Sequence, residues 1–560
     1  MEIRYVTEPN KARKAVDWLI QHHWLGVDCE TTGLDPYTSR VRLLQVAVIT
    51  GVVLIFDLDK IPADILKPLS AVPWATFNGQ FEYQHLYRIG IEPPRMHDLM
   101  LMDRLATHEI HNLGQVTGID KTEQLSDWAL PELSEAQLQY AAIDPLVTIR
   151  KSFELLPKIP RAVYDLWRDV IPVLAKSTLS GQSFNWSGHA DLVSDWEKEK
   201  HNLLHSLDTH MPNVNPNSGQ QIGEWLKDNL DSTVLDNWPK TDTGRLSTNS
   251  STLTLFGNLP AIAPLLQYKK VQKLINTYGK GYNKHKHILT SNLHPQYQIG
   301  RTRTGRLACS NPNTQQVPSS SDFRSLFIAP PGMTLVSADF SQIELRVAAL
   351  LSGDLNMIDS YAAGIDLHAK TAASVAGIPI KSVTPSQRQA AKPVNFGVLY
   401  GQQPPSLVQT AKTSYGVDMT EDEARMALLH FGKAYPQLNR WQRDMREQAR
   451  ETGQVSSKSG LVRDFHVQGG GYINGEAVNM PVQATAAEVL LASLNRLMRP
   501  LYGTVHDEVT IFVPEEDAEA AAHELEAAMV EGFMQIFSNG EKLLKGLVEV
   551  KTGGNWSEVH

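Results

Sequence analysis

The sequence predicts a multi-domain α/β protein, and three observations support that prediction. The chain has 560 residues, enough for roughly three or four cores of about 150 residues each. Apolar strands alternate with turns near its start, and a second strand region opens at Met333–Asp339 after a long helical stretch. Hydrophobic residues make up 42% and charged residues 20%, so a folded globular protein is expected rather than a disordered one.

The first region is predicted to be a mixed sheet flanked by helices. The expected strands are Trp24–Cys29, Leu43–Thr50 and Val52–Leu58. The last two join at Thr50-Gly51 as a hairpin, and helical patterns dominate after Pro62. The proline-containing segment Pro157–Pro160 suggests a boundary, so the first domain is expected to span residues 1–157.

The rest of the chain is predicted to be helical before it returns to strands. Helical patterns prevail to about residue 290, and the strand Met333–Asp339 then opens the second α/β region. A helical insertion is expected from about Leu355 to Ala449, followed by an apolar hairpin at Leu501–Val513. Residues 158–560 are therefore treated as a second, larger unit.

The charge pattern leaves two interpretations open. The formal net charge of −9 argues against bulk electrostatic adhesion to nucleic acid. Between Tyr268 and Leu289, however, there are six lysines and no acidic residue. Arg301, Arg303 and Arg306 follow, and such a strip could neutralise a phosphate backbone. A charge run alone is more often a solvated face, so the strip gains weight only from its surroundings.

The sequence also indicates the cellular location of the protein and the state of its cysteines. No stretch of about 18 apolar residues could span a bilayer, and the first ten residues lack the regions of a signal peptide. We therefore expect a cytoplasmic location, in a bacterium or an infected host cell, and no membrane partner. The two cysteines, Cys29 and Cys309, cannot form a disulfide framework or a four-thiolate zinc site, so both are predicted to be free thiols.

Carboxylates near the start of the chain form the first candidate site. On a strand, Asp28 and Glu30 point to the same face, and their mutual repulsion favours a bound Mg²⁺ or Mn²⁺. Alone, such a pair is usually a solvated feature of a strand. Two further pairs strengthen the interpretation: Asn78 with Glu82, and Tyr140 with Asp144. Each pair is four residues apart and would share one face of a helix.

This order of residues resembles the DEDD-type 3′→5′ exonucleases in their tyrosine-bearing form, over about residues 20–150. The resemblance implies an RNase H-like fold and two metal ions at a scissile phosphate. The implied metal ligands are Asp28, Glu30, Glu82 and Asp144, and Tyr140 would orient the attacking water. Glu82 stands where the family has Asp, and its extra methylene moves the carboxylate by about 1.5 Å.

Two aspartates far apart in the sequence form the second candidate site. Asp339 ends the apolar strand that precedes an amphipathic helix, and Asp507 lies at the turn of the expected hairpin Leu501–Val513. Two strand-end aspartates of this kind could share two Mg²⁺ ions. The plainer alternative is a pair of unrelated turn residues.

Between these aspartates lies a predicted helix with a distinctive stripe. Thr384, Pro385 and Gln387 provide a capping residue, an N1 proline and a capping-box partner. Three side chains then recur at every fourth residue: Arg388, Lys392 and Phe396. Two cations and a ring on one face suit a triphosphate and the adjoining base or sugar, although a solvated basic helix is an equal alternative. Pro393 is expected to bend this helix.

In this order, the three segments resemble motifs A, B and C of the DNA polymerase I family, also called family A. The similarity extends through Arg301–Leu307, Asn311–Asn313 and Asn479–Gln483 to Gly553–Trp556, and is weakest at about residues 160–260. It implies a right-hand polymerase domain at residues 158–560. The implied subdomains are a thumb at about 190–295, a palm at about 300–354 and 455–560, and fingers at about 355–454.

The resemblance also implies roles for single residues. Asp339 and Asp507 would bind the catalytic metals. The implied nucleotide-binding residues are Gln342, Glu344, His368, Arg388, Lys392, Phe396 and Tyr400. The implied DNA-contacting residues are Arg306, Asn479, Gln483 and His506.

Four of these roles are more specific. Lys392 would lie near the proton delivered to pyrophosphate and act in catalysis, and Phe396 would stack on the incoming nucleotide. Tyr400 would close the base-pair pocket, and Glu344 would exclude a ribose 2′-hydroxyl. Each site is expected to bind two Mg²⁺ ions, with Mn²⁺ as a substitute.

The expected function is therefore template-directed DNA synthesis from dNTPs with 3′→5′ proofreading during replication. Primer–template DNA is the expected partner, with a processivity factor or helicase as a further candidate. Gly475 stands where the family often has Arg, which puts one template contact in doubt. No 5′-nuclease segment precedes the exonuclease-like region, a layout similar to bacteriophage replicative enzymes, so removal of RNA primers is not expected.

Two alternatives have specific features against them. A polymerase that uses RNA or ribonucleotides is disfavoured by Glu344, because a long carboxylate beside the sugar would clash with a 2′-hydroxyl. A DNA-binding scaffold without chemistry is disfavoured because Asp339, Asp507, Arg388 and Lys392 are all present.

Overall fold

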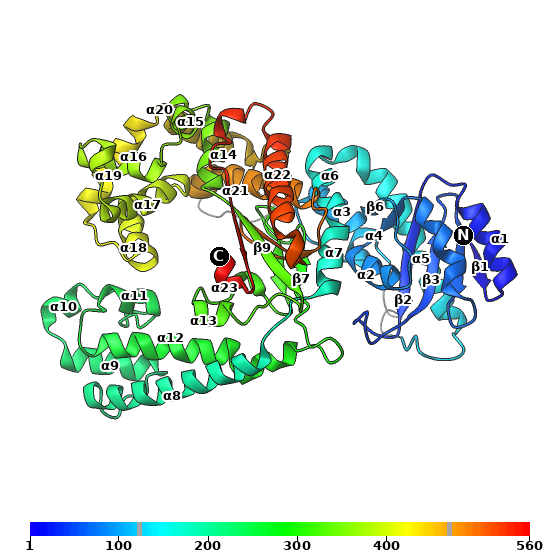
Figure 1. Cartoon of the computed structure of the whole chain (residues 1–560), viewed down its shortest axis with the longest axis horizontal. Coiled ribbons are helices and arrows are strands. Elements are labelled where there is room, and N and C mark those ends of the chain that lie inside the picture. Colours follow the sequence, from blue (N-terminus) through cyan, green and yellow to red (C-terminus); the bar gives the residue numbers. More distant parts are fainter. Residues whose placement is uncertain (120–125, 467–472) are drawn as a thin grey trace.

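The computed structural model describes residues 1–119, 126–466 and 473–560, with only the backbone described at 473–474. Figure 1 shows a sheet-containing part at one end of the molecule, which holds the N-terminus, and a larger part built around a second sheet. Two groups of helices extend from that second sheet, one on each side of an open space. The predicted α/β class is confirmed.

The first sheet is mixed and has the order β1-β4-β3-β2-β5-β6 in the described residues. Its strands are β1 (Glu2–Val6), β2 (Leu25–Thr31), β3 (Val41–Ala47), β4 (Val52–Asp57), β5 (Trp74–Thr76) and β6 (Met96–Asp98). β3 pairs antiparallel with both β2 and β4, and the remaining pairs are parallel. The predicted hairpin is confirmed, whereas β1, β5 and β6 were not anticipated.

Helices cover this sheet on both sides. They are α1 (Pro9–Leu19), α2 (Gln80–Arg88), α3 (Leu99–Thr107), α4 (Leu113–Thr117) and α5 (Glu135–Leu155), with the 3₁₀ segment η1 (Ala63–Ala71). α5 packs across β2, β3, β4 and β5, so it covers most of one face. The strand pattern that predicted β2 is confirmed: Val27 and Cys29 are buried, while the alternate residues Asp28 and Glu30 are partly exposed.

Helices continue the chain into the second part. They are α6 (Arg161–Asp169), α7 (Ile171–Ser180), α8 (Trp186–His210), α9 (Gly219–Asn229), α10 (Ser232–Asp236), α11 (Ser250–Leu255) and α12 (Ile262–Tyr278), with η3 (Leu156–Lys158) and η4 (Lys280–His285). The long helices α8 and α12 lie side by side (Figure 1). Around their far ends, Leu207, Ile222, Trp238 and Leu265 belong to a separate apolar core.

The second sheet is antiparallel and has the order β12-β13-β9-β14. Its strands are β9 (Met333–Phe340), β12 (Leu501–Val505), β13 (Glu508–Pro514) and β14 (Val548–Gly553). Smaller strand pairs are β7 (Gln296–Gln298) with β8 (Ala308–Ser310), and β10 (Gln454–Ser456) with β11 (Val462–Asp464). The strand predicted at Met333–Asp339 and the hairpin predicted at Leu501–Val513 are both confirmed.

Helices support this sheet from one side. α22 (Ala518–Ile536) packs on β9, β13 and β14, and α21 (Ile473–Leu494) packs on α22. α14 (Ile343–Ser352) follows β9 directly and also contacts α21. The remaining short elements are α13 (Ser321–Arg324), α23 (Trp556–Val559), η5 (Thr314–Gln316), η7 (Glu515–Asp517) and η8 (Glu541–Leu543).

The predicted helical insertion is confirmed. It contains α15 (Leu355–Ala363), α16 (Leu367–Ala376), η6 (Ile380–Ser382), α17 (Pro385–Leu399), α18 (Pro404–Tyr415), α19 (Glu421–Ala434) and α20 (Pro436–Thr452). The capping box of α17 forms as expected, because Gln387 N donates to Thr384 Oγ1 at 3.2 Å and Thr384 N donates to Gln387 Oε1 at 2.9 Å. α17 runs without interruption through Pro393.

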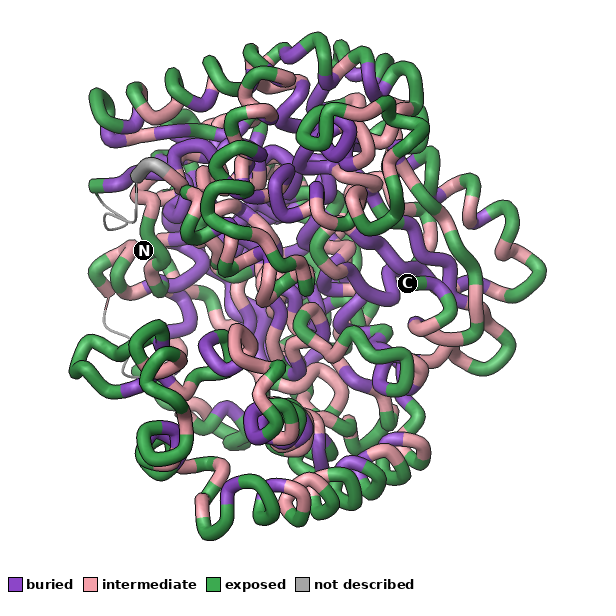
Figure 2. The backbone as a smooth tube through the Cα atoms, turned by 90° about the vertical axis from the view of Figure 1, so that its left-hand side faces the viewer, coloured by how far each residue is buried: buried purple, intermediate pink, exposed green. Residues whose placement is uncertain are grey.

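One continuous cluster of buried apolar side chains joins the first sheet, the second sheet and the helical insertion. Figure 2 shows these buried segments gathered in the middle of the molecule, with exposed residues along the outer helices. Trp167 on α6 is fully buried and lies against the backbone at Gly300. Cys29 and Cys309 are free and buried, as predicted. No helix in the described ranges combines the length and apolar content that crossing a bilayer requires.

A glycine sets the distance between α5 and β2, and this generates a stability prediction. A Cβ atom at Gly26 would lie 2.1 Å from the carbonyl oxygen of Pro145 and 3.0 Å from Cβ of Ile149, both on α5. Gly26→Ala should therefore lower the melting temperature, at a cost of about 1–3 kcal/mol for overpacking. Gly223→Ala is the matched control, because Gly223 on α9 has nothing within 4 Å of that position. Equal melting temperatures for the two variants in scanning fluorimetry would contradict this packing.

Candidate active sites

The pairing of β9 with β13 brings the two distant aspartates together. Asp339 lies opposite Glu508 in the register of these strands, and Asp507 is the residue before Glu508 in the turn. The backbone N–H of Phe340 donates to the carbonyl oxygen of Asp507 at 3.3 Å. The structure therefore places both carboxylates at the same end of the central strands.

Electrostatics reflect this proximity. Desolvation raises the pKa of Asp339, and repulsion from Asp507 raises it further. Burial raises the pKa of Asp507 too, and Glu344 adds to that shift. Like charges held this close favour a cation between them.

Glu508 is adjacent in sequence but is fully engaged inside the sheet. Its Oε1 accepts from Ser337 Oγ at 2.9 Å and from Trp556 Nε1 at 2.8 Å, and its Oε2 lies 2.7 Å from His560 Nδ1. Burial alone would raise the pKa of Glu508, but these bonds outweigh it and lower the pKa. The motif around Trp556 was predicted, but its bond to Glu508 was not.

Glu344 is held between two of the other predicted residues. It is buried, Arg306 Nη2 donates to its Oε1, and Tyr400 Oη donates to its Oε2 at 3.1 Å. Burial raises the pKa of Tyr400, and the Glu344 carboxylate raises it further. Asp507 interacts electrostatically with both Glu344 and Arg306, so this trio borders the aspartate pair.

The stripe on α17 is present as predicted. The side chains at every fourth position are partly exposed, while most of the intervening residues are buried: the stripe is Arg388, Lys392, Phe396 and Tyr400. The rings of Phe396 and Tyr400 stack with centroids 6.4 Å apart. Arg388 Nε donates to Asp366 Oδ2, an ionic partner that sequence analysis did not anticipate.

His368 lies behind this stripe. Its ring centroid is 5.9 Å from that of Phe396, and its Nδ1 is 2.7 Å from the side-chain nitrogen Nδ2 of Asn395. Burial lowers the pKa of His368 to about 4, despite the nearby Asp366 carboxylate. The imidazole is therefore neutral near pH 7 and can act only through hydrogen bonds.

The remaining predicted residues lie on neighbouring elements. Gln342 adopts a left-handed backbone conformation before α14, with φ 55°, and its Oε1 accepts from Tyr361 Oη at 3.0 Å. His506 has φ 55° in the turn before Asp507 and is exposed. Asn479 and Gln483 are partly exposed and four residues apart on α21, so they share a face.

The carboxylates of the first candidate site line one cavity of about 870 Å³. The predicted residues on its wall are Asp28, Glu30, Glu82, Tyr140 and Asp144. They come from β2, α2 and α5, and Glu82, Tyr140 and Asp144 are buried. The structure thus gathers every residue that the sequence singled out for this site, because Asn78 lines the cavity too.

The carboxylates that line this cavity repel one another. Burial raises the pKa of Glu82 well above its usual range, and Asp28 raises it further. Burial also raises the pKa of Tyr140, with added contributions from Asp144, Glu30 and Asp28. In the ranges that the structure describes, no three His, Cys, Asp or Glu side chains converge as a closed metal-binding group, so these carboxylates line a wall.

The expectation that Asn78 shares a helix face with Glu82 is wrong. Asn78 has φ 62° and precedes α2, which begins at Gln80. The buried carboxylate of Asp98 holds this turn, because it accepts from the backbone N–H of Gly79 at 2.8 Å and of Asn78 at 3.3 Å. Asp98 was not among the predicted residues, although its position just before a helix is a capping signal.

The donor set of the cavity suits a hard divalent cation. Its carboxylates offer only oxygen ligands, which Mg²⁺ and Mn²⁺ prefer. Among the described residues, Glu82 Oε2 is buried and has no hydrogen-bond partner. A cation would satisfy this atom and relieve the repulsion that raises the pKa of Glu82.

Comparison with known proteins gives family matches over most of the chain. The model described as "DNA polymerase family A" matches residues 189–558, and the one described as "3'-5' exonuclease" matches residues 3–160. The DNA polymerase I of Aquifex aeolicus is 30% identical over 570 residues, which cover 94% of this chain and 96% of that protein.

Other relatives are longer than this chain. The DNA polymerase I of Pseudomonas aeruginosa is 29% identical over 75% of this chain and 47% of that protein, and the thermostable DNA polymerase I of Thermus aquaticus is 34% identical over 61% and 42%. The chain thus spans about half the length of the Pseudomonas protein. A solved structure titled "POL domain of Pol1 from M. smegmatis complex with DNA primer-template and dNTP" matches with a TM-score of 0.83, covers 99% of this chain and 100% of that chain, and is 20% identical, which shows the fold.

Proposed function

Because the chain belongs to DNA polymerase family A and carries a 3′–5′ exonuclease domain before the polymerase region, we propose that Asp339 and Asp507 are the catalytic metal ligands of its DNA synthesis. The observation that supports this assignment is the register of β9 and β13, which places both carboxylates at one end of the sheet. Family A polymerases depend on divalent metal ions, and two Mg²⁺ ions per site, replaceable by Mn²⁺, are the proposed cofactors.

The stripe on α17 is the proposed triphosphate site. When bound, the metal ions would activate the primer 3′-hydroxyl and neutralise the triphosphate. Arg388 and Lys392 would bind phosphate oxygens on the exposed side of the helix, with Lys392 placed to supply a proton to the leaving pyrophosphate. Asp366 holds Arg388 in the stripe before the nucleotide arrives. Neutral His368 would donate a hydrogen bond to phosphate.

The trio around Glu344 is the proposed sugar and base-pair pocket. Glu344 is buried, and its contacts to Arg306 and Tyr400 fix its carboxylate beside the aspartate pair. A side chain held in this way would clash with a ribose 2′-hydroxyl. Phe396 would stack on the base, with Tyr400 beyond it and Gln342 at the start of α14. Such a pocket selects deoxynucleotides by size.

Primer–template DNA is the proposed macromolecular partner. Arg306, Asn479, Gln483 and His506 would contact it near the aspartates. The division into thumb (about 190–295), palm (about 300–354 and 455–560) and fingers (about 355–454) stays a proposal, with the exonuclease domain at 1–157 before it. A processivity factor or helicase as a further partner, and the cytoplasmic location, remain predictions.

The carboxylate cavity is the proposed proofreading site. Asp28, Glu30, Glu82 and Asp144 would hold the metal ions, and Tyr140 would orient the attacking water. Glu82 reaches the cavity from α2 with its longer side chain, so the substitution of Glu for the family's Asp is compatible with the site. We expect Mg²⁺- or Mn²⁺-dependent degradation of single-stranded 3′ ends.

Removing either polymerase aspartate should separate binding from chemistry. Asp339→Ala and Asp507→Ala should each lower primer extension by roughly a thousandfold while primer–template binding stays within about twofold, because metal positioning supplies most of the catalysis. Glu549→Ala is the matched control, since Glu549 is a carboxylate directly opposite Asp339 on β14 that has no proposed role in metal binding. Extension near the wild-type rate by either aspartate variant, in a quenched-flow assay, would remove this assignment.

Sugar selection gives a second test. Glu344→Ala should raise ribonucleotide incorporation by about tenfold or more, because it removes the bulk beside the sugar. Glu344→Gln keeps that bulk and loses the charge, so it should retain the wild-type preference. If the Gln variant also accepts ribonucleotides, the ion pair with Arg306 rather than side-chain size would control selection. Competition between rNTP and dNTP on one template measures the ratio.

The proofreading site should fail independently of synthesis. Asp28→Ala should lower degradation of a single-stranded oligonucleotide by roughly a thousandfold, and primer extension should remain unchanged because the aspartate pair lies on another sheet. Asp17→Ala, an exposed carboxylate on α1, is the control. Wild-type protein that degrades no 3′ end in either metal would show that the cavity is not a nuclease site.

A further inference from the structure

The loop after β2 forms part of the wall of the carboxylate cavity. β2 ends at Thr31, and Thr32, Gly33 and Leu34 continue along the cavity. Leu34 is 85% exposed, so its neighbours do not hold it in place. Thr31 Oγ1 donates to the carbonyl oxygen of Gly33 at 2.7 Å, and the backbone N–H of Thr32 donates to the carbonyl oxygen of Arg40 at 3.0 Å. The wall is therefore tied to the end of β2 and to the residues that follow it.

Asp35 fixes the loop internally. Its Oδ1 accepts from the backbone N–H of Tyr37 at 2.8 Å, and its Oδ2 accepts from Thr38 Oγ1 at 2.9 Å. Burial alone would raise the pKa of Asp35, but the bonds from Tyr37 and from a histidine described next lower it. The carboxylate stays ionised and remains a strong acceptor.

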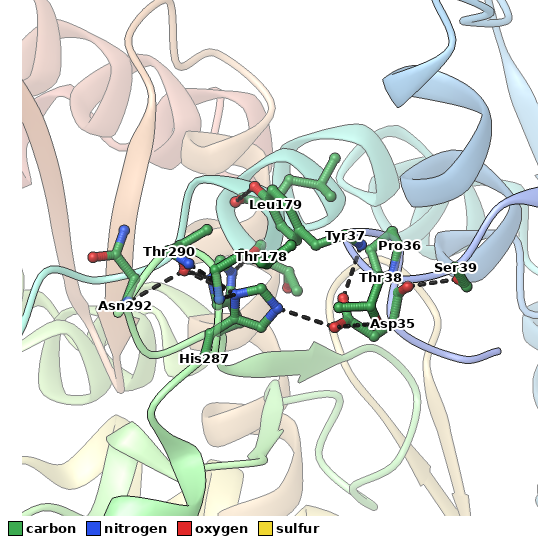
Figure 3. A network of polar contacts seen from close by, with 12 residues as sticks. Asp35, Pro36, Tyr37, Thr38, Ser39, Thr178, Leu179, His287, Thr290 and Asn292 are labelled. Atoms are coloured by element: carbon green, nitrogen blue, oxygen red, sulfur yellow. Dashed lines mark hydrogen bonds and ion pairs between the residues drawn. The ribbon is translucent and has the colours of Figure 1, made fainter.

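The same carboxylate reaches across to the polymerase region. His287 Nε2 lies 3.0 Å from Asp35 Oδ2, and the His287 side chain is only 13% exposed (Figure 3). His287 follows directly on the lysine strip that ends at Lys286. Asp35 belongs to the segment matched by the exonuclease family and His287 to the segment matched by the polymerase family.

The bonds on the other ring nitrogen fix the tautomer of His287. Its Nδ1 accepts from the backbone N–H of Thr290 at 3.1 Å and of Leu289 at 3.3 Å. A nitrogen that accepts these bonds carries no proton, so the proton of neutral His287 is on Nε2. Nε2–H therefore donates to Asp35, and the link needs no charge on the histidine.

A relay of hydrogen bonds anchors His287 to α7. Thr290 Oγ1 lies 2.7 Å from His294 Nε2, and His294 Nδ1 donates to the carbonyl oxygen of Thr178 at 2.7 Å. Burial lowers the pKa of His294, which favours the neutral ring that this relay requires. The histidine that holds the loop is thus itself held by a rigid helix.

Ring packing supports the same contact. Tyr37 lies 5.1 Å from the His287 ring and 5.2 Å from the His294 ring, and its Oη donates to the carbonyl oxygen of Leu179. The Arg88 guanidinium also packs on the Tyr37 ring, 4.1 Å from its centroid. Figure 3 shows Asp35 and Tyr37 on one segment and His287 on the facing segment, with the contact between Asp35 and His287 joining the two.

We propose that Asp35 and His287 are positioning residues for the exonuclease reaction: their hydrogen bond holds the Gly33–Leu34 wall of the cavity in place against the polymerase region. The inference rests on the proposed nuclease function of that cavity. Asp35 is five residues beyond Glu30 and does not line the cavity. The pair thus acts through the wall, so its loss should weaken substrate binding more than the chemical step.

The chain offers variants that separate the link from the fold of the loops. His287→Asn places an amide oxygen where Nδ1 accepts from Thr290, but it is too short to reach Asp35. His287→Gln extends an amide N–H to the position of Nε2 and keeps the link. Asp35→Asn keeps an oxygen for Tyr37 N–H and presents an N–H toward the Nε2–H of His287, which breaks the bond. His287→Asn and Asp35→Asn thus both break the Asp35–His287 bond, and Asp35→Asn also loses the bond from Thr38 Oγ1. His287→Gln keeps the Asp35–His287 bond but gives up the bonds that Nδ1 accepts from Leu289 and Thr290.

The experiment measures steady-state degradation of a single-stranded oligonucleotide in Mg²⁺. His287→Asn and Asp35→Asn should each raise KM by about fivefold to tenfold, as expected for the loss of one hydrogen bond of ordinary strength, with kcat within about twofold. His287→Gln should behave as wild type, and the Asp35→Asn/His287→Asn double variant should be no worse than either single one. Primer extension by all variants should stay within about twofold of wild type.

Three outcomes would overturn the proposal: a wild-type KM for His287→Asn, an equal defect in His287→Gln, or additive effects in the double variant. Hydrogen exchange of the peptide containing residues 32–40 gives a readout that does not depend on activity. It should accelerate in His287→Asn and Asp35→Asn and stay unchanged in His287→Gln. If wild-type protein degrades no single-stranded DNA, the proposed nuclease function fails, and the exchange comparison alone decides whether the link exists.

Discussion

The antiparallel register of β9 and β13 is the constraint on which the proposed polymerase site depends. It brings Asp339 opposite Glu508 and so places Asp507, in the turn, beside Asp339. The bonds of Glu508 to Ser337, Trp556 and His560 hold that register from inside the sheet. A slip of one residue would reverse the faces of the strand and separate the two carboxylates. The residues proposed for this site on α14, α17 and α21 therefore surround a carboxylate pair whose position is fixed by the sheet.

The carboxylate cavity is built on a different principle, the close approach of a helix to a strand. Gly26 on β2 leaves room for the backbone of α5 at Pro145, which brings Tyr140 and Asp144 over Asp28 and Glu30. Asp98 holds the turn before α2 and so delivers Glu82 from a third element. The cavity therefore depends on several separate contacts, and its loop is fastened to the polymerase region through Asp35 and His287.

Local patterns predicted much of this fold, since strand alternation and helix capping are encoded within a few residues. The alternation at Asp28 and Glu30 and the capping box at Thr384 are examples. The three-residue strands β5 and β6 were missed because so short a segment has no period to read. Asn78 was misplaced because its left-handed turn depends on Asp98, twenty residues away. The pairing of Arg388 with Asp366 likewise depends on how two helices pack.

The central claim is that one chain places a synthetic site and a separate nuclease site on two sheets. The most direct test is a primer-extension assay of the purified wild-type protein with a defined primer–template, in Mg²⁺ and with a chelator. The account predicts templated extension with all four dNTPs, slow shortening of the primer when dNTPs are withheld, and neither reaction after chelation. Absence of templated extension in both Mg²⁺ and Mn²⁺ would contradict it.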